Sequence, residues 1–292
     1  MKGKISLSYI MTTYNKLSYL KITLPYLISN CKKDEEIVIV DGGSNDGTRE
    51  YLEKLVEEKK IHQFISEKDF GEAHGTNKAM FLAKGELLKI ITDDDIFDFE
   101  VIDFCKRHLL AHENIDICGT DGLGISSTSK KNNFLVTKYH TGFQEWQNSK
   151  MPFLFCGLSY MIRRNSLARL GLLSTQYKII DLEYSVRVSA LNVNIAFCNA
   201  FSFVNIVGPD SNSNKFYESI KAEKKKLKTL YPNISNLNYS IGFKDALKRN
   251  LNNIVKKNNK VSDTVSVSYA DLVQSSLVEL ENRNKNIIMS FL

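Results

Sequence analysis

Short apolar runs alternate with longer segments of helical periodicity through residues 1–115. Such alternation is typical of βα units, in which a mostly parallel sheet is covered by helices on both faces. The expected strands are Ile5–Met11, Glu36–Val40, Gln63–Ser66, Leu87–Ile91 and Ile115–Cys118, and the expected helices are Leu17–Ser29, Thr48–Lys59, Glu72–Ala83 and Asp98–His112. The pattern therefore predicts an α/β fold.

The pattern changes after residue 118. Residues 119–149 are rich in Gly, Ser, Thr, Asn and Lys and lack periodicity, which favours long loops or a peripheral hairpin. Further on, we expect strands at Phe153–Ile162 and within Val193–Val207, and helices at Asn165–Gly171, Asp181–Leu191, Lys215–Leu230, Ile241–Lys257 and Ala270–Leu280. The expected organisation is an α/β unit over residues 1–209, with halves 1–115 and 116–209, and a helical C-terminal region over 210–292.

Composition adds a broad class and a compartment. Of the 292 residues, 43% are apolar and 25% are charged, which is typical of globular proteins and argues against disorder. The five cysteines are scattered and never spaced C-x-x-C, so neither a disulfide framework nor a zinc ribbon is indicated. The longest nearly uncharged stretch, Met151–Ile162, is shorter than the roughly 20 residues of a membrane-spanning helix. We expect a cytoplasmic protein.

The net charge of +6 is unevenly distributed, with a basic stretch at Lys215–Lys260. Such a stretch forms either a solvated helix face or a contact with a polyanion such as anionic lipid. Peripheral contact with the inner face of the cytoplasmic membrane, packing on the α/β unit and a homodimer interface are the alternatives. No RNA- or DNA-binding motif accompanies the basic residues, so nucleic acid is not expected.

Polar residues follow three of the predicted strands, at Thr12–Asn15, Asp41–Ser44 and Asp93–Asp95. Ligands of open parallel sheets bind at the carboxyl ends of the strands, so these residues are expected to meet at one site. Three adjacent carboxylates repel one another unless a cation compensates their charge, and oxygen ligands suit Mg²⁺ or Mn²⁺ carrying a diphosphate. The alternative is an acidic turn that caps the following helix.

Taken together, these motifs resemble family 2 glycosyltransferases of the GT-A fold. The segments that carry the resemblance, in the family's order, are IMTTYNK, VIVDGGSNDGT, SEKDFGEAHGTNKAMFLAKGELLKIITDDD and LGLLSTQYKIIDLEYSVRVSALN. The resemblance implies a Rossmann-like, mostly parallel sheet flanked by helices. It also implies an inverting, metal-dependent transferase that uses a nucleotide-diphospho-sugar.

The resemblance implies donor-binding roles for several residues. Thr12 and Tyr14 would flank the nucleobase, and Asp41 would accept a hydrogen bond from a ring N–H. That hydrogen bond suits uracil or thymine, which favours a UDP- or dTDP-sugar and leaves cytosine and guanine open. The other residues at donor-binding positions of the family are Asn15, Asp69, Gly71, Asn77, Asp93 and Asp94.

The acidic motif also implies a cofactor, Mn²⁺ or Mg²⁺. Thr92 stands where the family has its first acid, so Asp94 is the first candidate for the metal ligand and Asp95 is the second. His74 replaces a family acid. It could contact the donor phosphate or the acceptor, and a structural role is the alternative.

The last segment implies that Asp181 is the general base, although Asp at the start of a helix is also a common N-cap. Glu183 and Arg187 are expected on the acceptor side, where their spacing of four residues lets them pair on one helix face. Trp146 and Tyr160 are candidates for stacking on an acceptor sugar, and burial in the core is the alternative for both.

The expected reaction is transfer of a hexosyl group to a hydroxyl of a glycan or a polyprenyl-diphosphate-linked glycan, in bacterial surface polysaccharide synthesis. Two other classes stay open. A haloacid-dehalogenase-type phosphatase also has D-x-D after a strand, although Ile96-Phe97 follows here in place of its nucleophile loop. A non-catalytic protein would bind the nucleotide-sugar without transferring or hydrolysing it.

Overall fold

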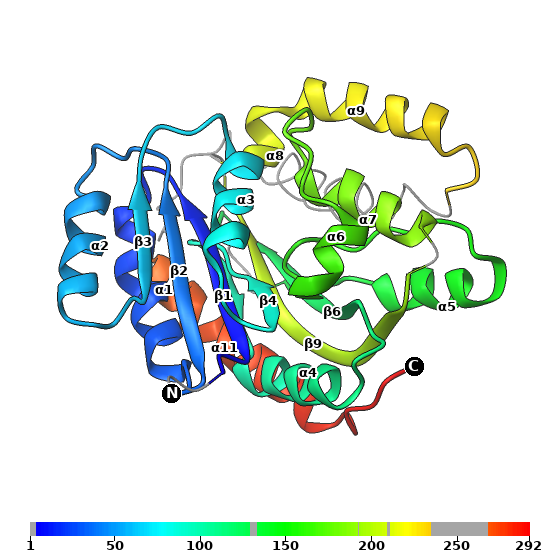
Figure 1. Cartoon of the computed structure of the whole chain (residues 1–292), viewed down its shortest axis with the longest axis horizontal. Coiled ribbons are helices and arrows are strands. Elements are labelled where there is room, and N and C mark those ends of the chain that lie inside the picture. The colour runs from blue at the N-terminus through cyan, green and yellow to red at the C-terminus, as the bar shows by residue number, and fades with distance from the viewer. Residues whose placement is uncertain (1–3, 129–132, 192, 209–210, 235–267) are drawn as a thin grey trace, which may run out of the picture.

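The computed structural model describes residues 4–128, 133–191, 193–208, 211–234 and 268–292 (Figure 1). The strands are β1 (Leu7–Thr13), β2 (Glu35–Asp41), β3 (Gln63–Ser66), β4 (Leu87–Ile90), β5 (Ile96–Phe97), β6 (Ile117–Ser126), β7 (Leu135–Val136), β8 (Met161–Arg163) and β9 (Ile195–Val207). The helices are α1 (Leu17–Asn30), α2 (Thr48–Glu57), α3 (Glu72–Leu82), α4 (Phe99–Ala111), α5 (Tyr139–Ser149), α6 (Leu167–Leu170), α7 (Ile180–Ala190), α8 (Asn212–Lys215), α9 (Tyr217–Leu230) and α11 (Tyr269–Lys285), with a 3₁₀ turn η1 at Arg164–Ser166.

The strands form one mixed sheet in the order β3-β2-β1-β4-β8-β6-β9-β5, with β7 beside β6. β1 is parallel to β2 and β4, and β2 is parallel to β3, whereas β8 is antiparallel to both of its neighbours. The register places Thr13 opposite Asp41, so the loops after β1 and β2 begin side by side. We call the edge of the sheet formed by the C-terminal ends of β1, β2 and β4 the carboxyl edge.

Two apolar clusters, one on each face of the parallel strands, form most of the core. Successive side chains of a strand point to opposite faces. Accordingly, Leu7, Tyr9 and Met11 of β1 pack in the cluster shared with α1, α2 and α4, whereas Ile10 packs in the cluster shared with α3, α5 and α7. The strands and helices expected within residues 5–112 are all present, with ends shifted by at most two residues.

The second half differs from the sequence expectation. Within residues 119–149, the expected hairpin is present, because β7 pairs antiparallel with the extension of β6 to Ser126, whereas the helix α5 was not expected. The buried face of α5 consists of Gly142, Phe143 and Trp146, which is too few apolar positions for a clear helical period. The strand expected over Phe153–Ile162 is also wrong, because the aromatic side chains of this run pack in the core while β8 pairs only from Met161.

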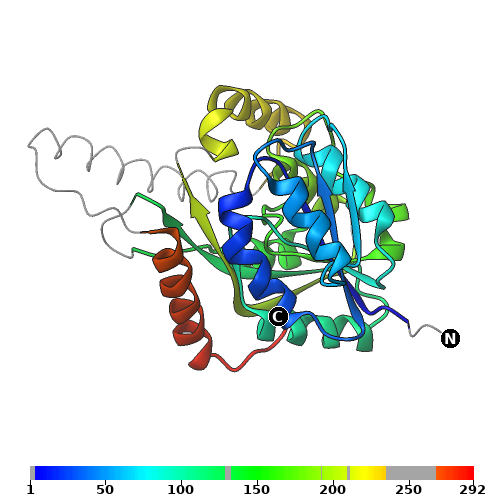
Figure 2. The same ribbon diagram turned by 90° about the vertical axis from the view of Figure 1, so that its left-hand side faces the viewer.

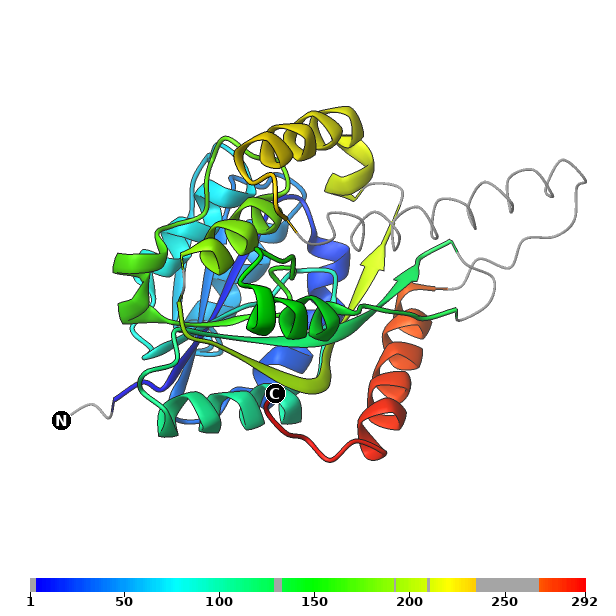
Figure 3. The same ribbon diagram turned by 90° about the vertical axis from the view of Figure 1, so that its right-hand side faces the viewer.

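The described part of the C-terminal region packs on the rest of the chain. Helix α11, orange-red in Figures 2 and 3, lies beside the long strands, where Leu272, Val273 and Leu280 join an apolar cluster with side chains of β5, β6 and β9. Helix α9 lies above α7 in Figure 1 and buries Leu227 in a separate cluster with α7. The helix expected at Ile241–Lys257 lies outside the described residues. Among the described helices, none has the length and apolar character of a membrane span.

Candidate functional site

The loops after β1 and β2 are tied together at the carboxyl edge. The backbone N–H of Asn15 donates to Ser44 Oγ at 2.7 Å, and Asn15 Oδ1 accepts from the backbone N–H of Asn45 at 2.9 Å. Asn15 has φ 52°, a left-handed conformation that Asn adopts more readily than most residues. Next to it, Tyr14 is 58% exposed, so its ring is accessible to a ligand.

Asp41, at the end of β2, is fully buried. Its Oδ2 accepts hydrogen bonds from the backbone N–H groups of Gly43 at 3.2 Å and Ser44 at 3.0 Å, and from Ser66 Oγ at 2.6 Å. Its Oδ1 accepts a further bond from the Ser44 hydroxyl. The carboxylate therefore fixes the turn after β2, and a nucleobase N–H would have to compete with these donors.

Thr12, Asp69 and the start of α3 meet where two glycines leave room for them. A Cβ on Gly75 would lie 2.1 Å from Thr12 Oγ1 and 3.1 Å from Asp69 Oδ2, and a Cβ on Gly42 would lie 2.8 Å from the same Asp69 oxygen. Asp69 Oδ1 accepts from the backbone N–H of Gly71, whose φ of 109° favours glycine. Thus Thr12, Asp69 and Gly71, which the motifs singled out, do lie together.

Residues 93–95, which we call the acidic turn, follow β4. The side chains of Asp93 and Asp95 form hydrogen bonds with different partners. Asp93 Oδ2 accepts from Thr13 Oγ1 at 2.7 Å, whereas Asp95 Oδ1 accepts from the backbone N–H of Ile206 at 2.7 Å and from the Asn205 amide at 3.1 Å. Both carboxyl groups are buried. This burial, together with the charge of the aspartate between them, raises the pKa of Asp93 and of Asp95.

Asp94, between them, is partly exposed and pairs with Lys16, whose Nζ lies 2.5 Å from Asp94 Oδ2. The carbonyl oxygen of Asp94 accepts a 2.9 Å hydrogen bond from the hydroxyl of Tyr269, the first residue of α11. Lys16 and Tyr269 were not identified from the sequence. The motif gives no signal for Tyr269, because the residue is distant in the chain and its hydroxyl bonds the backbone of the turn rather than a motif side chain.

A divalent cation fits this turn only in part. Among the residues that the structure describes, no three His, Cys, Asp or Glu side chains are grouped to hold a metal ion. Asp95 accepts hydrogen bonds from Asn205 and Ile206 of β9, so its carboxyl group is already engaged within the protein. Its expected role as a second metal ligand beside Asp94 stays a prediction. Mg²⁺ or Mn²⁺ can nevertheless bind through one carboxylate, waters and substrate phosphates, and Asp94 fits that role.

Asp181 lies in the first turn of α7, where the backbone N–H of Gly157 donates to its Oδ2 at 3.2 Å. Glu72, at the start of α3, is exposed to solvent. Partial desolvation of its carboxyl group and the negative charges of Asp181 and Asp94 raise its pKa. Three carboxylates from α3, α7 and the acidic turn therefore interact electrostatically. The sequence analysis missed Glu72, which also accepts a 3.0 Å hydrogen bond from Asn212 of α8.

Three other predicted site residues stabilise the turn before α7. They are Asn77, Glu183 and Arg187. Both ends of the Asn77 amide bond the backbone of Leu173, at 2.8 and 3.0 Å. Arg187 pairs with Glu183, at 2.7 Å from Nε to Oε1, and donates to the carbonyl oxygens of Leu170 and Leu172. The Asn77 side chain is thus committed to the protein backbone rather than open to a nucleotide.

The remaining candidates have structural contacts as well. Trp146 is 5% exposed and its indole N–H donates to the Ser189 carbonyl at 2.9 Å, while Tyr160 is fully buried. The prediction that these two rings face an acceptor is therefore wrong, because both belong to the core beneath α5 and α7. His74 Nδ1 accepts from the backbone N–H of Phe70 at 3.1 Å and so supports the loop before α3.

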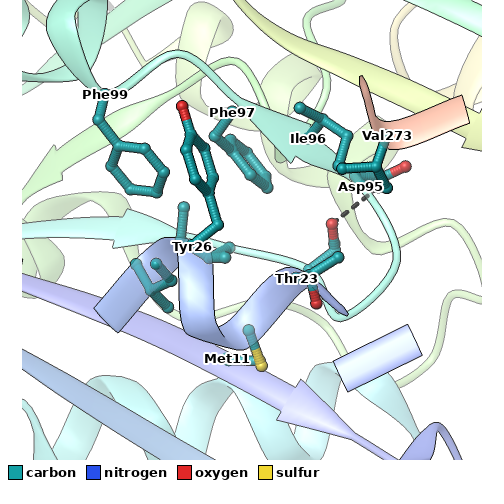
Figure 4. A pocket seen from close by; sticks show the side chains of 11 residues that line it. Met11, Thr23, Tyr26, Asp95, Ile96, Phe97, Phe99 and Val273 are labelled. Atoms are coloured by element: carbon teal, nitrogen blue, oxygen red, sulfur yellow. Dashed lines mark hydrogen bonds between the residues drawn. The ribbon is translucent and has the colours of Figure 1, made fainter. Parts of the chain in front are cut away.

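A small cavity lies next to Asp95 of the acidic turn, between α1, β5 and α11 (Figure 4). Its lining is mostly apolar and includes Met11, Tyr26, Phe97 and Val273. A volume of about 20 Å³ has room for one water molecule and not for a sugar nucleotide. This cavity is therefore not the substrate site.

A family model described as glycosyl transferase family 2 matches residues 8–171, more than half of the chain. An uncharacterized glycosyltransferase of Haemophilus influenzae is 22% identical over 73% of this chain and 84% of its own length. The putative teichuronic acid biosynthesis glycosyltransferase TuaG of Bacillus subtilis is 32% identical over 30% of this chain, and the match spans 35% of TuaG.

Solved structures are similar as well. The S. aureus TarS fragment 1–349 in complex with UDP-GlcNAc is 18% identical, with a TM-score of 0.59 over 76% of this chain and 66% of that fragment. The mannosyltransferase PcManGT of Pyrobaculum calidifontis, in complex with GDP-Man and Mn²⁺, is 15% identical, with a TM-score of 0.56 over 94% of this chain and 80% of its own. These likenesses show the GT-A fold. Together with the family model, they show that the chain belongs to glycosyl transferase family 2.

Proposed function

We propose that this protein transfers a sugar from a nucleoside diphosphate to a hydroxyl of a glycan acceptor, with inversion at the anomeric carbon. One observation carries the proposal. Helix α3 joins the carboxyl edge to α7, because its Gly75 lies against Thr12 and Asp69 and its Asn77 amide bonds Leu173, just before α7. The charges of Asp94 and Asp181 both act on Glu72, at the start of the same helix. A diphosphate held beside Asp94 and a base at Asp181 would therefore lie at one site, as a single displacement requires.

The donor would bind along the carboxyl edge. The exposed ring of Tyr14 offers a stacking face for the nucleobase, and Thr12 and Asp69 lie together nearby. We propose a UDP- or dTDP-sugar, although Asp41 would have to release its own loop to contact the base. The TarS fragment with UDP-GlcNAc supports a uridine donor, and PcManGT with GDP-Man keeps guanosine as the alternative.

Asp94 would hold Mg²⁺ or Mn²⁺. When bound there, the cation would offset the negative charge that develops on the departing diphosphate. The Lys16 ammonium is close enough to Asp94 to contribute a second positive charge. Asp93 and Asp95 would act mainly by fixing the turn, because their carboxyl groups are hydrogen-bonded within the protein.

Asp181 would act as the general base. The acceptor oxygen would attack the anomeric carbon while the bond to the diphosphate oxygen breaks, and the hydroxyl proton would pass to the carboxylate. The hydrogen bond from Gly157 engages Oδ2 and so orients the group. Asp181 lies in the first turn of α7, where the helix dipole attracts negative charge.

The proposed acceptor is a glycan of bacterial surface polysaccharide synthesis, carried on a polyprenyl diphosphate. Support comes from TuaG, whose name places it in teichuronic acid biosynthesis, and from the basic helix α9 beside α7. Glu223 of α9 accepts from the backbone N–H groups of Lys178 at 2.7 Å and Ile179 at 3.3 Å, which anchors α9 next to the turn that carries Asp181. Contact with anionic lipid and a homodimer both remain predictions.

Nucleotide release tests the proposal. The purified protein is incubated with UDP-, dTDP- and GDP-sugars and Mn²⁺, with and without a lipid-linked glycan, and free nucleoside diphosphate is measured. Acceptor-stimulated release from one donor, with a glycoside product of inverted configuration, supports a transferase. Binding without transfer or hydrolysis would favour a non-catalytic nucleotide-sugar-binding protein.

A further inference from the structure

We propose that Lys16 is an exchangeable counter-ion of the diphosphate site. In the free protein it pairs with Asp94. When a divalent cation binds Asp94, Lys16 pairs with the donor diphosphate instead. This inference rests on the proposed function. It assigns Lys16 a role in both metal and donor binding.

The position of Lys16 supports an exchangeable contact. Its Nζ lies 2.5 Å from Asp94 Oδ2, and the two side chains are 26% and 27% exposed, so ligands can reach both. The ammonium also lies 4.7 Å from the ring centroid of Tyr19. Asp93 and Glu72 lie near enough to interact with the same charge. Lys16 therefore provides a positive charge among carboxylates that would otherwise repel one another.

Lys16 and a divalent cation compete for the same oxygen ligand. A lysine ammonium is a compact point charge that can pair with either a carboxylate or a phosphate, and its long stem lets it move between them. A cation on Asp94 would repel the ammonium at contact distance, whereas a diphosphate nearby would attract it. In the free protein Lys16 should therefore weaken metal binding, and in the complex it should strengthen donor binding.

The place of Lys16 in the fold favours an anion as its second partner. Lys16 is the residue that precedes α1, a helix of 14 residues. The first N–H of this helix, that of Leu17, already donates to the Asp46 carboxylate, at 3.1 Å from Oδ2. The charge left for a diphosphate is therefore the Lys16 ammonium. Lys16 lies two residues after the exposed Tyr14, in the loop after β1. A diphosphate next to this loop would meet that positive charge.

A purely structural ion pair predicts something different. Removing Lys16 would then change stability but leave Mn²⁺ affinity and nucleotide affinity as they are. The competing explanations are separated by measuring metal binding without nucleotide and nucleotide binding without metal. Neither measurement depends on catalytic activity.

The experiment uses the full chain and three variants. Lys16→Met removes the charge, Lys16→Arg keeps it, and Lys21→Met removes an exposed lysine of the same helix. Free Mn²⁺ is measured by electron paramagnetic resonance without nucleotide. Binding of UDP, dTDP and GDP is measured by calorimetry in EDTA and in excess Mn²⁺. Circular dichroism checks that each variant is folded.

We expect Lys16→Met to bind Mn²⁺ about fivefold more tightly and metal-free nucleotide about fivefold more weakly, the upper size expected for a partly exposed charge pair. Lys16→Arg and Lys21→Met should resemble the wild type. If the wild type binds nucleotide with Mn²⁺ and Lys16→Met shows neither change, the inference is wrong and the proposed function stands. If the wild type binds none of the three nucleotides, the inference and the proposed function are both wrong.

Discussion

The backbone N–H of Gly157 donates a 3.2 Å hydrogen bond to Oδ2 of Asp181. This bond joins the segment before β8 to the first turn of α7 and so fixes the orientation of one carboxylate. The catalytic role that we propose for Asp181 depends on that orientation, because a general base must lie within hydrogen-bond reach of the acceptor hydroxyl.

We expect Asp181→Asn to lower turnover by about 10²–10⁴-fold, the usual contribution of a general base, because the amide cannot take the hydroxyl proton. Affinity for the nucleoside diphosphate should stay within about twofold, since Asp181 does not contact it in our account. Steady-state kinetics and calorimetry check the two parts. Full transferase activity in the variant would exclude Asp181 as the base.

The Asn77 amide bonds both backbone groups of Leu173. We expect Asn77→Ala to lower the free energy of unfolding by about 1–3 kcal/mol, because these groups are left unpaired in a buried place. Asn148→Ala, on an exposed helix face, should cost less than about 0.5 kcal/mol. Urea unfolding measures both. Weaker donor binding at unchanged stability would instead support the nucleotide contact expected from the sequence.

Lys89 of β4 is fully buried, with Nζ 2.5 Å from the carbonyl oxygen of Leu158, and burial lowers its pKa from 10.5 to about 8. At pH values between about 8 and 10.5, Lys89 is protonated in the unfolded chain and neutral in the folded chain. The free energy of unfolding should therefore rise as the pH rises from about 8 toward 10.5, by about 1.4 kcal/mol per pH unit at most.

The comparison that isolates this effect is Lys89→Met, which removes the titrating group. Between pH 7 and 9.5, unfolding in urea should show the wild type gaining about 2 kcal/mol relative to Lys89→Met. Lys21→Met, at an exposed position, should follow the wild type. An equal pH dependence in wild type and Lys89→Met would mean that Lys89 stays charged in the folded protein.

Helix α9 exposes Lys221, Lys225 and Lys228. If it contacts anionic lipid, changing all three to Glu should reduce binding to phosphatidylglycerol vesicles at least tenfold, because each lysine near such a surface contributes about 1 kcal/mol. The matched control carries the same charge change at Lys21, Lys33 and Lys59. Co-flotation measures binding. Equal binding of the two variants, or none by the wild type, would remove the membrane contact from the account.

The sequence predicted the first half of the fold well because its signals are local and strong. β1 and β2 are buried along nearly their whole length, so they appear as continuous apolar runs bounded by turn residues. The second half lacked such signals. Helix α5 has few buried residues, and the aromatic run from Phe153 packs in the core without pairing as a strand.

The site could be predicted only as far as strand ends and motifs reach. The motifs brought together Thr12, Asp69 and Gly71, and the topology confirms that they are neighbours. They could not show that Asp95 turns to β9, nor that Tyr269 supports the acidic turn from 175 residues away. Such contacts depend on how distant segments pack, and a local pattern does not record that.

The most direct test of the account is a crystal structure of the protein grown with UDP and Mn²⁺. The account predicts the base against Tyr14, Mn²⁺ on Asp94 and the diphosphate beside Lys16. Nucleotide bound away from the carboxyl edge, or a Lys16–Asp94 pair that persists unchanged at saturating UDP with no metal between them, would contradict it.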